Sequence, residues 1–224
     1  MRRHVWCLPM VLLSACASAC DVGRGLYSAV VQRSGAPPRE ELRRIRVRDT
    51  TMARGLARSR VVVLPVAVIG GEVRPDSQAA ARLADRLVRE GLAASARVGP
   101  PAPVPFERHP NEAMIFWRRW QALGAWVQQH PMQDADVVLL VDVFGRPERG
   151  VVGAVHAMAT TGGGELGWSG FWNSHQPLYK EMPPHSADDA TAMVATALAR
   201  DSRAKGAPRA ASGRAESRDP RVTR

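Results

Sequence analysis

The chain has 224 residues, of which 45% are hydrophobic and 23% are charged, so it can build an ordinary apolar core. Its net charge of +10 is typical of nucleic-acid-binding proteins, but the basic excess lies in two flanks, 24–60 and 201–224, and the stretch between them is slightly acidic. The basic tail has no aromatic residue on which a base could stack, so we expect no nucleic-acid partner.

The first residues follow the order of a secretory signal. Two arginines precede an apolar stretch over 5–13, and small residues follow at 14–19, which is the charged, apolar, small-residue order of an export signal. The apolar stretch contains Pro9 and is well short of the ~20 residues that a membrane-spanning helix needs. Residues 1–15 are therefore interpreted as a signal peptide.

The end of this segment, Leu13-Ser14-Ala15-Cys16, resembles the lipobox of bacterial lipoproteins, in which cleavage occurs before an acylated cysteine. The resemblance implies lipidation of Cys16, with palmitate among the acyl chains. Ala17 follows this cysteine, and the absence of an aspartate there favours the periplasmic face of the outer membrane. Several acyl chains, each contributing about 0.8 kcal/mol per buried methylene, can anchor a chain that has no spanning helix.

Two alternatives remain open for the leader. Ordinary cleavage after residue 19 would give a secreted protein that starts at Cys20, and a lipobox around Cys20 would place Asp21 next to the anchor, which is associated with inner-membrane retention. In each case the cysteines at positions 7, 16 and 20 lie within the first twenty residues, ahead of the predicted domain. The mature body therefore has no disulfide framework and no thiolate metal site.

The rest of the chain divides into three parts. Residues 16–60 are expected to form the anchor and a basic linker, with a short helix over 39–45. Residues 61–200 have the length of one α/β domain. Residues 201–224 have almost no apolar side chains to bury, so we expect a disordered basic tail.

The first predicted element of the domain is a buried strand over 61–69, because a β-branched run ends there at two glycines. Pro65 has no amide donor, so it marks an edge, a bulge or the strand's end. A helix is expected next, capped by Asp76 or Ser77 and running to about Ser95. Its buried stripe consists of Ala80, Leu83, Ala84, Leu87, Val88 and Gly91.

A proline-rich loop over 99–110 follows, after a short strand near 96–98. Asn111 can cap a second helix that ends near Gln129. Four residues of this helix lie three or four positions apart and share a face. They are Phe116, Trp120, Leu123 and Val127, whereas Trp117 and Trp126 fall off that stripe and are expected to be less covered.

The last elements are a strand over 135–143, a hairpin of strands 151–160 and 165–172, and a helix that starts at Ser186. The first of these strands is apolar on both faces, which is typical of a central strand. The three glycines at 162–164 favour the hairpin turn. The predicted fold is a single α/β sandwich of two or three layers with a mixed sheet, in the order β-α-(β)-α-β-β-β-α.

This pattern resembles a known domain through the strand VVVLPVAV at 61–68, the strand over 135–140 and the hairpin with Gly164-Glu165-Leu166. Over 61–200 it is similar to the α/β domain shared by curli-secretion-type lipoproteins, the amino-terminal domain of the translocation protein TolB and several uncharacterised envelope lipoproteins. The resemblance implies binding to other envelope proteins and no catalysis by this domain. It supplies no role for the second helix's tryptophans or for 168–175.

Residues that could support catalysis are Asp142, His156, His175, Ser169 and Ser174. Strand alternation allows the first two to meet across neighbouring strands, but no nucleophile elbow accompanies them. No zinc-type histidine pair and no glycine-rich phosphate loop is present either. We therefore expect no catalytic residue, no metal and no cofactor.

Six tryptophans are the more informative feature, because tryptophan favours interfaces. The predicted partner-binding residues are Trp117, Trp126, Trp168 and Trp172. The favoured hypothesis is a lipid-anchored interaction module that binds envelope proteins, in outer-membrane assembly or transport, with its oligomeric state left open. The alternatives are an envelope hydrolase using His156 and His175, and a glycan-binding module using Trp168 and Trp172.

Overall fold

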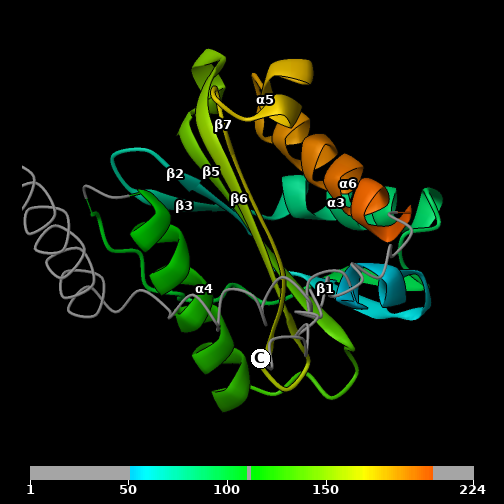
Figure 1. The fold of residues 1–224 in the computed structure, drawn as a ribbon. Coiled ribbons are helices and arrows are strands. Elements are labelled where there is room, and N and C mark those ends of the chain that lie inside the picture. Colours follow the sequence, from blue (N-terminus) through cyan, green and yellow to red (C-terminus); the bar gives the residue numbers. More distant parts are fainter. Residues whose placement is uncertain (1–50, 110–111, 204–224) are drawn as a thin grey trace, which may run out of the picture.

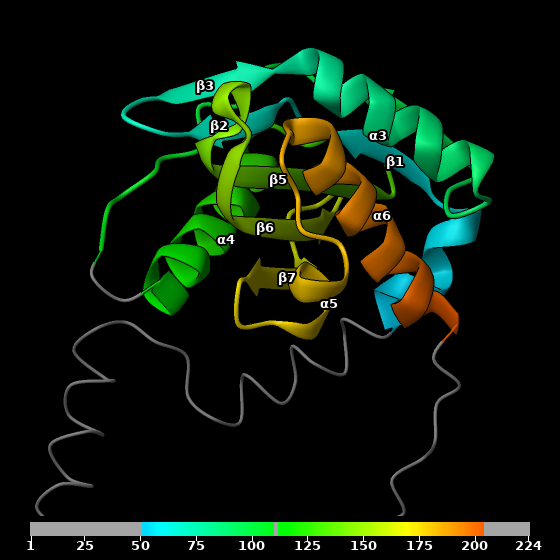
Figure 2. The same ribbon diagram turned by 90° about the horizontal axis from the view of Figure 1, so that it is seen from above.

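The structure, a computed structural model, describes residues 51–109 and 112–203. A mixed sheet lies between α4 (Glu112–Gln129) on one face and α3 (Ser77–Arg89) and α6 (Ala187–Arg203) on the other (Figures 1 and 2). The predicted α/β sandwich is confirmed, and it has three layers. None of the helices in the described ranges combines the length and apolarity that crossing a bilayer requires.

Several sequence-based predictions fall outside the described residues. These are the signal peptide over 1–15, the lipidation at Cys16, the short helix over 39–45, the cap at Asn111 and the tail from 204 onward.

The first predicted strand is present as two collinear pieces, β1 (Arg60–Val63) and β2 (Val66–Ile69). Both pair in parallel with the same side of β5 (Val137–Arg146). The ladder continues through the break, since the Leu64 amide donates to the Leu139 carbonyl at 2.9 Å. Pro65 therefore ends β1, as expected for a residue without an amide donor.

The remaining strands extend the sheet on both sides. β4 (Ser95–Val98) runs parallel to β1, and β3 (Val73–Asp76) runs antiparallel to β2. On the other side, β6 (Val151–Thr161) pairs with β5, and β7 (Leu166–Asn173) pairs with β6, both antiparallel. The two outer edges are thus β3 with β4, and β7, and the central position predicted for β5 is confirmed.

The first long helix, α3, ends earlier than predicted. Asp76 caps it by accepting a hydrogen bond from the Ala79 amide at 2.9 Å, but the helix stops at Arg89 because Gly91 takes a left-handed conformation with φ 68°. The expectation that Val88 and Gly91 belong to the buried stripe is wrong, since Val88 is 42% exposed and Gly91 is exposed and follows the helix.

Alternation along the strands divides the core into two parts. Even-numbered residues of β1 and β5 face α4 and bury Trp120, Leu123 and Val127 of that helix. Odd-numbered residues face α3 and α6. This second part also includes Ala53 and Leu56, which lie before residue 61, in a helical segment over 51–55 and in η1 (Leu56–Arg58).

The hairpin turn between β6 and β7 supports α4 by direct backbone contact. A Cβ added to Gly124 of α4 would lie 2.8 Å from the Gly164 carbonyl oxygen, and one added to Gly164 would lie 2.5 Å from the Gly124 carbonyl oxygen. Gly164 has φ 86°, which favours glycine. Glycine is therefore needed on both sides of this contact.

Between β7 and α6 lies an element that the sequence did not predict, the short helix α5 (Pro177–Glu181). The short helix η2 (Pro147–Arg149) between β5 and β6 was also not predicted. The predicted start of α6 is confirmed, since the Asp189 amide donates to Ser186 Oγ at 3.1 Å. The helix continues to Arg203 and so includes the first residues of the predicted tail.

Candidate functional site

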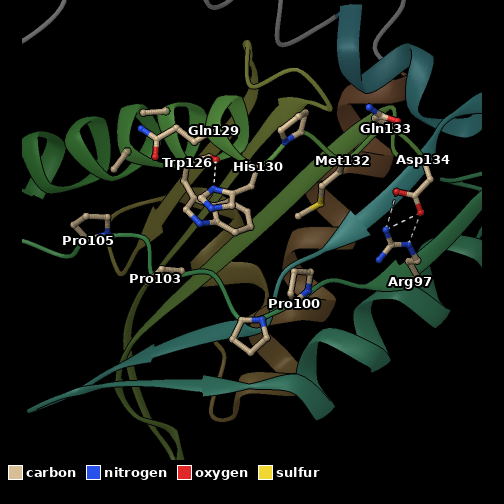
Figure 3. Close-up of a pocket in the computed structure, with 14 residues that line it drawn as sticks. Arg97, Pro100, Pro103, Pro105, Trp126, Gln129, His130, Met132, Gln133 and Asp134 are labelled. Atoms are coloured by element: carbon tan, nitrogen blue, oxygen red, sulfur yellow. Dashed lines mark hydrogen bonds and ion pairs between the residues drawn. The ribbon is translucent and has the colours of Figure 1, made fainter.

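A pocket of about 1140 Å³ lies between the proline-rich loop after β4 and the carboxyl-terminal half of α4 (Figure 3). One wall is the loop and the other is α4 with the turn that follows it. The lining residues are Arg97, Pro100, Pro101, Pro103, Pro105, Ala122, Ala125, Trp126, Gln129, His130, Pro131, Met132, Gln133 and Asp134.

The aromatic centre of the pocket is the pair Trp126 and His130. Their rings stack at a centroid distance of 5.1 Å with an interplanar angle of 21°. His130 Nδ1 donates a hydrogen bond to the Trp126 carbonyl oxygen at 3.0 Å, which holds the imidazole over the indole. The contact gives the pocket a flat, fixed surface with apolar and polar atoms side by side.

The far end of the pocket is polar. Arg97 Nη2 donates to both carboxylate oxygens of Asp134, at 2.9 Å and 2.7 Å. These hydrogen bonds hold the pKa of Asp134 below its usual range. The prolines of the loop have fixed φ angles, so the wall opposite α4 loses little conformational freedom when a ligand binds.

The other predicted partner-binding tryptophans do not join this pocket. Trp117 is only 8% exposed and belongs to the core beneath α4, so the expectation that it is less covered is wrong. Its ring packs edge-on against Trp120. Trp126, in contrast, is partly exposed and lines the pocket.

Trp168 and Trp172 lie on the opposite face of the sheet, packed with the α3 and α6 side of the core. As alternation predicts, they share a face, and their ring centroids are 6.1 Å apart. Trp168 is 1% exposed, and its Nε1 donates to Asp201 of α6 at 2.8 Å. The four tryptophans therefore cannot form one surface, and Trp168 offers almost no area to a ligand.

A second polar group of residues lies inside the core, where Arg119 of α4 meets Asp142 of β5. Arg119 Nε and Nη2 donate to the two carboxylate oxygens at 2.8 Å and 2.9 Å. Burial raises the pKa of Asp142, and the guanidinium opposes that rise. Arg119 Nη1 also donates to the carbonyl oxygens of Val104 and Pro105, so the pair ties the proline-rich loop to the core.

His156 lies beside this ion pair, opposite Asp142 in the β5–β6 register. Its ring is surrounded by Phe116, Phe144 and Phe171. Neither ring nitrogen has a hydrogen-bond partner among the described residues, and Glu112 Oε1 is 3.8 Å from Nε2. Burial, together with the nearby Arg119 charge, lowers the pKa of His156 to about 3, so the ring is neutral near pH 7.

This geometry offers little to a hydrolase. Both oxygens of Asp142 accept bonds from Arg119, so the carboxylate does not orient His156 as a catalytic base would require. Ser169 lies on β7 opposite Met158, whereas His175 lies exposed in the turn that follows, where its amide donates to Asn173 Oδ1 at 3.0 Å.

Sequence reasoning missed Arg119. The signal was available, because an arginine three residues after Phe116 and four before Leu123 lies on the buried stripe of the helix. An aspartate inside the apolar run of β5 is its natural partner, since buried charges are paired.

Comparison with known proteins does not place the chain in a family. No family model matches it, and no curated protein does. Among solved structures, it is similar to the PelC dodecamer from Paraburkholderia phytofirmans, at 18% identity and a TM-score of 0.35, over 66% of this chain and 89% of that chain. A variant of the same protein gives 19% identity and a TM-score of 0.34, over 66% and 90%.

The buried His156 makes a testable contribution to acid sensitivity. The unfolded chain takes up a proton on this residue below about pH 6.5, whereas the folded chain does so only near pH 3. The free energy of unfolding should therefore fall as pH drops between these values, by up to about 1.4 kcal/mol per pH unit. His156→Phe should flatten this part of the curve in urea unfolding at several pH values. Parallel curves for the two proteins would contradict the assignment.

Proposed function

We propose that this protein is a lipid-anchored lipoprotein of the bacterial cell envelope that binds other envelope proteins. The anchor is Cys16, and the body faces the periplasm from the outer membrane. The lipobox-like phrase before Cys16 and the resemblance of the α/β domain to curli-secretion-type and TolB-type domains support this proposal. The interaction serves outer-membrane assembly or transport.

The observation that carries the binding role is the pocket around Trp126. Tryptophan is enriched among the residues that contribute most to protein interfaces, and here the Trp126 indole stacks on the His130 ring and faces the proline-rich loop. Gln129 and Gln133 also line the pocket, and their amides can bond to the backbone of a bound chain. The pocket therefore suits an extended apolar segment of a partner protein.

Replacing Trp126 by alanine should weaken complex formation about thirtyfold or more, because central interface tryptophans contribute ~2 kcal/mol or more. A photo-reactive amino acid at Gln129 of the full chain should give a covalent adduct with the partner in intact cells. The same adduct should be lost when Trp126→Ala is added. The free energy of unfolding, measured in urea, should change little in this variant.

Val88→Ala provides the control for this experiment, because Val88 is an exposed apolar residue on α3, on the opposite face of the sheet. This variant should leave the adduct unchanged. An adduct that persists in Trp126→Ala would remove the pocket from the proposal.

Lipidation at Cys16 has a direct test in the mass of the mature amino terminus after extraction from membranes. The expected species starts at Cys16 and carries acyl chains, and Cys16→Ser should abolish both the cleavage and the acylation. A mature chain that starts unmodified at Cys20 would disprove the anchor without affecting the binding role of the pocket.

A further inference from the structure

The two outer edges of the sheet differ in how well they are protected against pairing with another chain. The edge formed by β3 and β4 consists of strands of four residues each, and it carries Arg74, Pro75 and Arg97. Short length, proline and charged side chains are the features that keep an edge strand from pairing. This edge is therefore blocked.

The β7 edge has none of these features. Its eight residues, Leu166–Asn173, contain no charged residue and no proline. Among the described residues, β7 pairs only with β6. The Met52 side chain lies against Gly167, since a Cβ on that glycine would be 2.3 Å from Met52 Sδ, and Trp168 is buried. Leu166 and the continuous stretch 169–173 stay partly exposed, and the longer stretch is the one free of Met52.

We propose that segment 169–173 of β7 pairs antiparallel with the same segment of a second copy of this chain, around a two-fold axis at Phe171. The pairing would join the two sheets through backbone hydrogen bonds. It would give a closed dimer, because each copy uses the same surface and no free edge is left for a third copy. It goes beyond the proposed binding function and uses no residue of the Trp126 pocket.

The side chains of this segment are complementary to themselves about Phe171. In the antiparallel register, Trp172 of one copy lies opposite Gly170 of the other, so no two large side chains lie opposite each other at these positions. The Trp172 ring already lies over Gly170 of its own strand, since a Cβ there would be 2.0 Å from Trp172 Cη2. The ring therefore shields the glycine of its own strand, and Gly170 leaves room for it in each copy.

On the other face, Ser169 lies opposite Asn173 of the second copy, and both are small and polar. No two side chains of like charge lie opposite each other in this register. Such a pair would destabilise the strand pairing. The β3 and β4 edges of a second copy are poorer partners for β7, because they present arginines and a proline. The chemistry of the segment thus favours pairing with itself.

Two differently tagged full-length copies, co-expressed and lightly cross-linked in cells, test this interface. Purification through one tag should recover the other copy. When both copies carry Ser169→Lys and Asn173→Lys, recovery should fall about tenfold or more, since lysines then face lysines across the axis. A lysine copy paired with a Ser169→Glu, Asn173→Glu copy should restore recovery.

The matched control is Ser95→Lys in both copies, which adds a lysine to an exposed position of the blocked edge and should leave recovery unchanged. A second readout does not depend on charged variants. When both copies also carry Cys20→Ser, which removes the remaining free thiol of the mature chain, one copy with Ser169→Cys and one with Asn173→Cys should form a disulfide-linked pair on oxidation, because opposite residues lie about 4.5–5.5 Å apart at Cα.

Failure of the wild-type copies to co-purify would overturn the proposal, as would undiminished recovery of the double-lysine pair. Absence of the disulfide-linked pair would overturn it as well. None of these results would bear on the adduct formed at Gln129.

Discussion

Replacing Arg119 by methionine is expected to destabilise the protein by about 3–5 kcal/mol, because it leaves the carboxylate of Asp142 buried without its partner. Asp142 is fully buried and Arg119 is 3% exposed, so water cannot replace the lost hydrogen bonds. The free energy of unfolding in urea, compared with that of the wild-type protein, measures the loss.

The double variant Arg119→Met, Asp142→Leu separates the charge from the packing. Removing both charges should recover much of the stability, since an apolar pair of similar volume is often as stable as a buried ion pair. Recovery should remain incomplete, because the Val104 and Pro105 carbonyl oxygens lose the donor that Arg119 provides. A double variant no more stable than Arg119→Met would contradict this explanation.

The single substitution Arg119→Met should also weaken binding of a partner at the Trp126 pocket. Pro105 belongs to the pocket wall, and Arg119 holds its carbonyl oxygen at 3.2 Å. Without that bond the loop should lose its fixed position. The adduct formed at Gln129 should decrease in Arg119→Met even under conditions where the protein remains folded.

Trp120→Ala is the second substitution with a large expected effect, about 3–5 kcal/mol of stability. The Trp120 side chain is 2% exposed and contacts the rings of Phe116 and Trp117. Its Nε1 also donates to the Ala159 carbonyl oxygen at 3.2 Å. Alanine would leave a large cavity between α4 and the sheet.

Trp120→Phe tests the two contributions separately. Phenylalanine fills part of the space but has no donor for Ala159, so about 1–3 kcal/mol should be lost. Thermal or urea unfolding of both variants measures this order. If Trp120→Ala cost less than Trp126→Ala, the assignment of Trp120 to the core and Trp126 to the pocket would be wrong.

Much of the fold could be predicted because local patterns and tertiary contacts agree. The β-branched run around Pro65, the apolar run of β5 and the glycine turn before β7 each favour one structure. Asp76 and Ser186 mark the helix starts through hydrogen bonds that involve only neighbouring residues. Such features need no knowledge of the rest of the chain.

The missed elements depend on distant contacts. β3 has a proline and two charged residues among four, and it forms a strand because β2 offers it a ladder. The short helix α5 packs on α6 and β7. Neither segment has a periodic pattern long enough to be recognised without its neighbours.

The candidate site was predicted in part. Trp126 could be singled out because it falls off the buried stripe of α4, but the same argument gave the wrong exposure for Trp117. The core around α4 is wide enough to cover Trp117 as well, partly through Val104 of the loop. Periodicity shows the direction of a side chain, whereas its exposure depends on how far the neighbouring layers extend.

The backbone contact between Gly124 and Gly164 has a consequence for the order in which the protein folds. α4 has no side chain of its own at this point, and the Gly164 carbonyl oxygen and the Leu166 side chain that it meets take their positions only when β6 and β7 have paired. The hydrogen bonds within α4 are local and do not require the hairpin. Docking of α4 in its native position does require that the β6–β7 hairpin has formed. We therefore expect the layer that carries Trp126 to reach its native position only after the β6–β7 hairpin has closed.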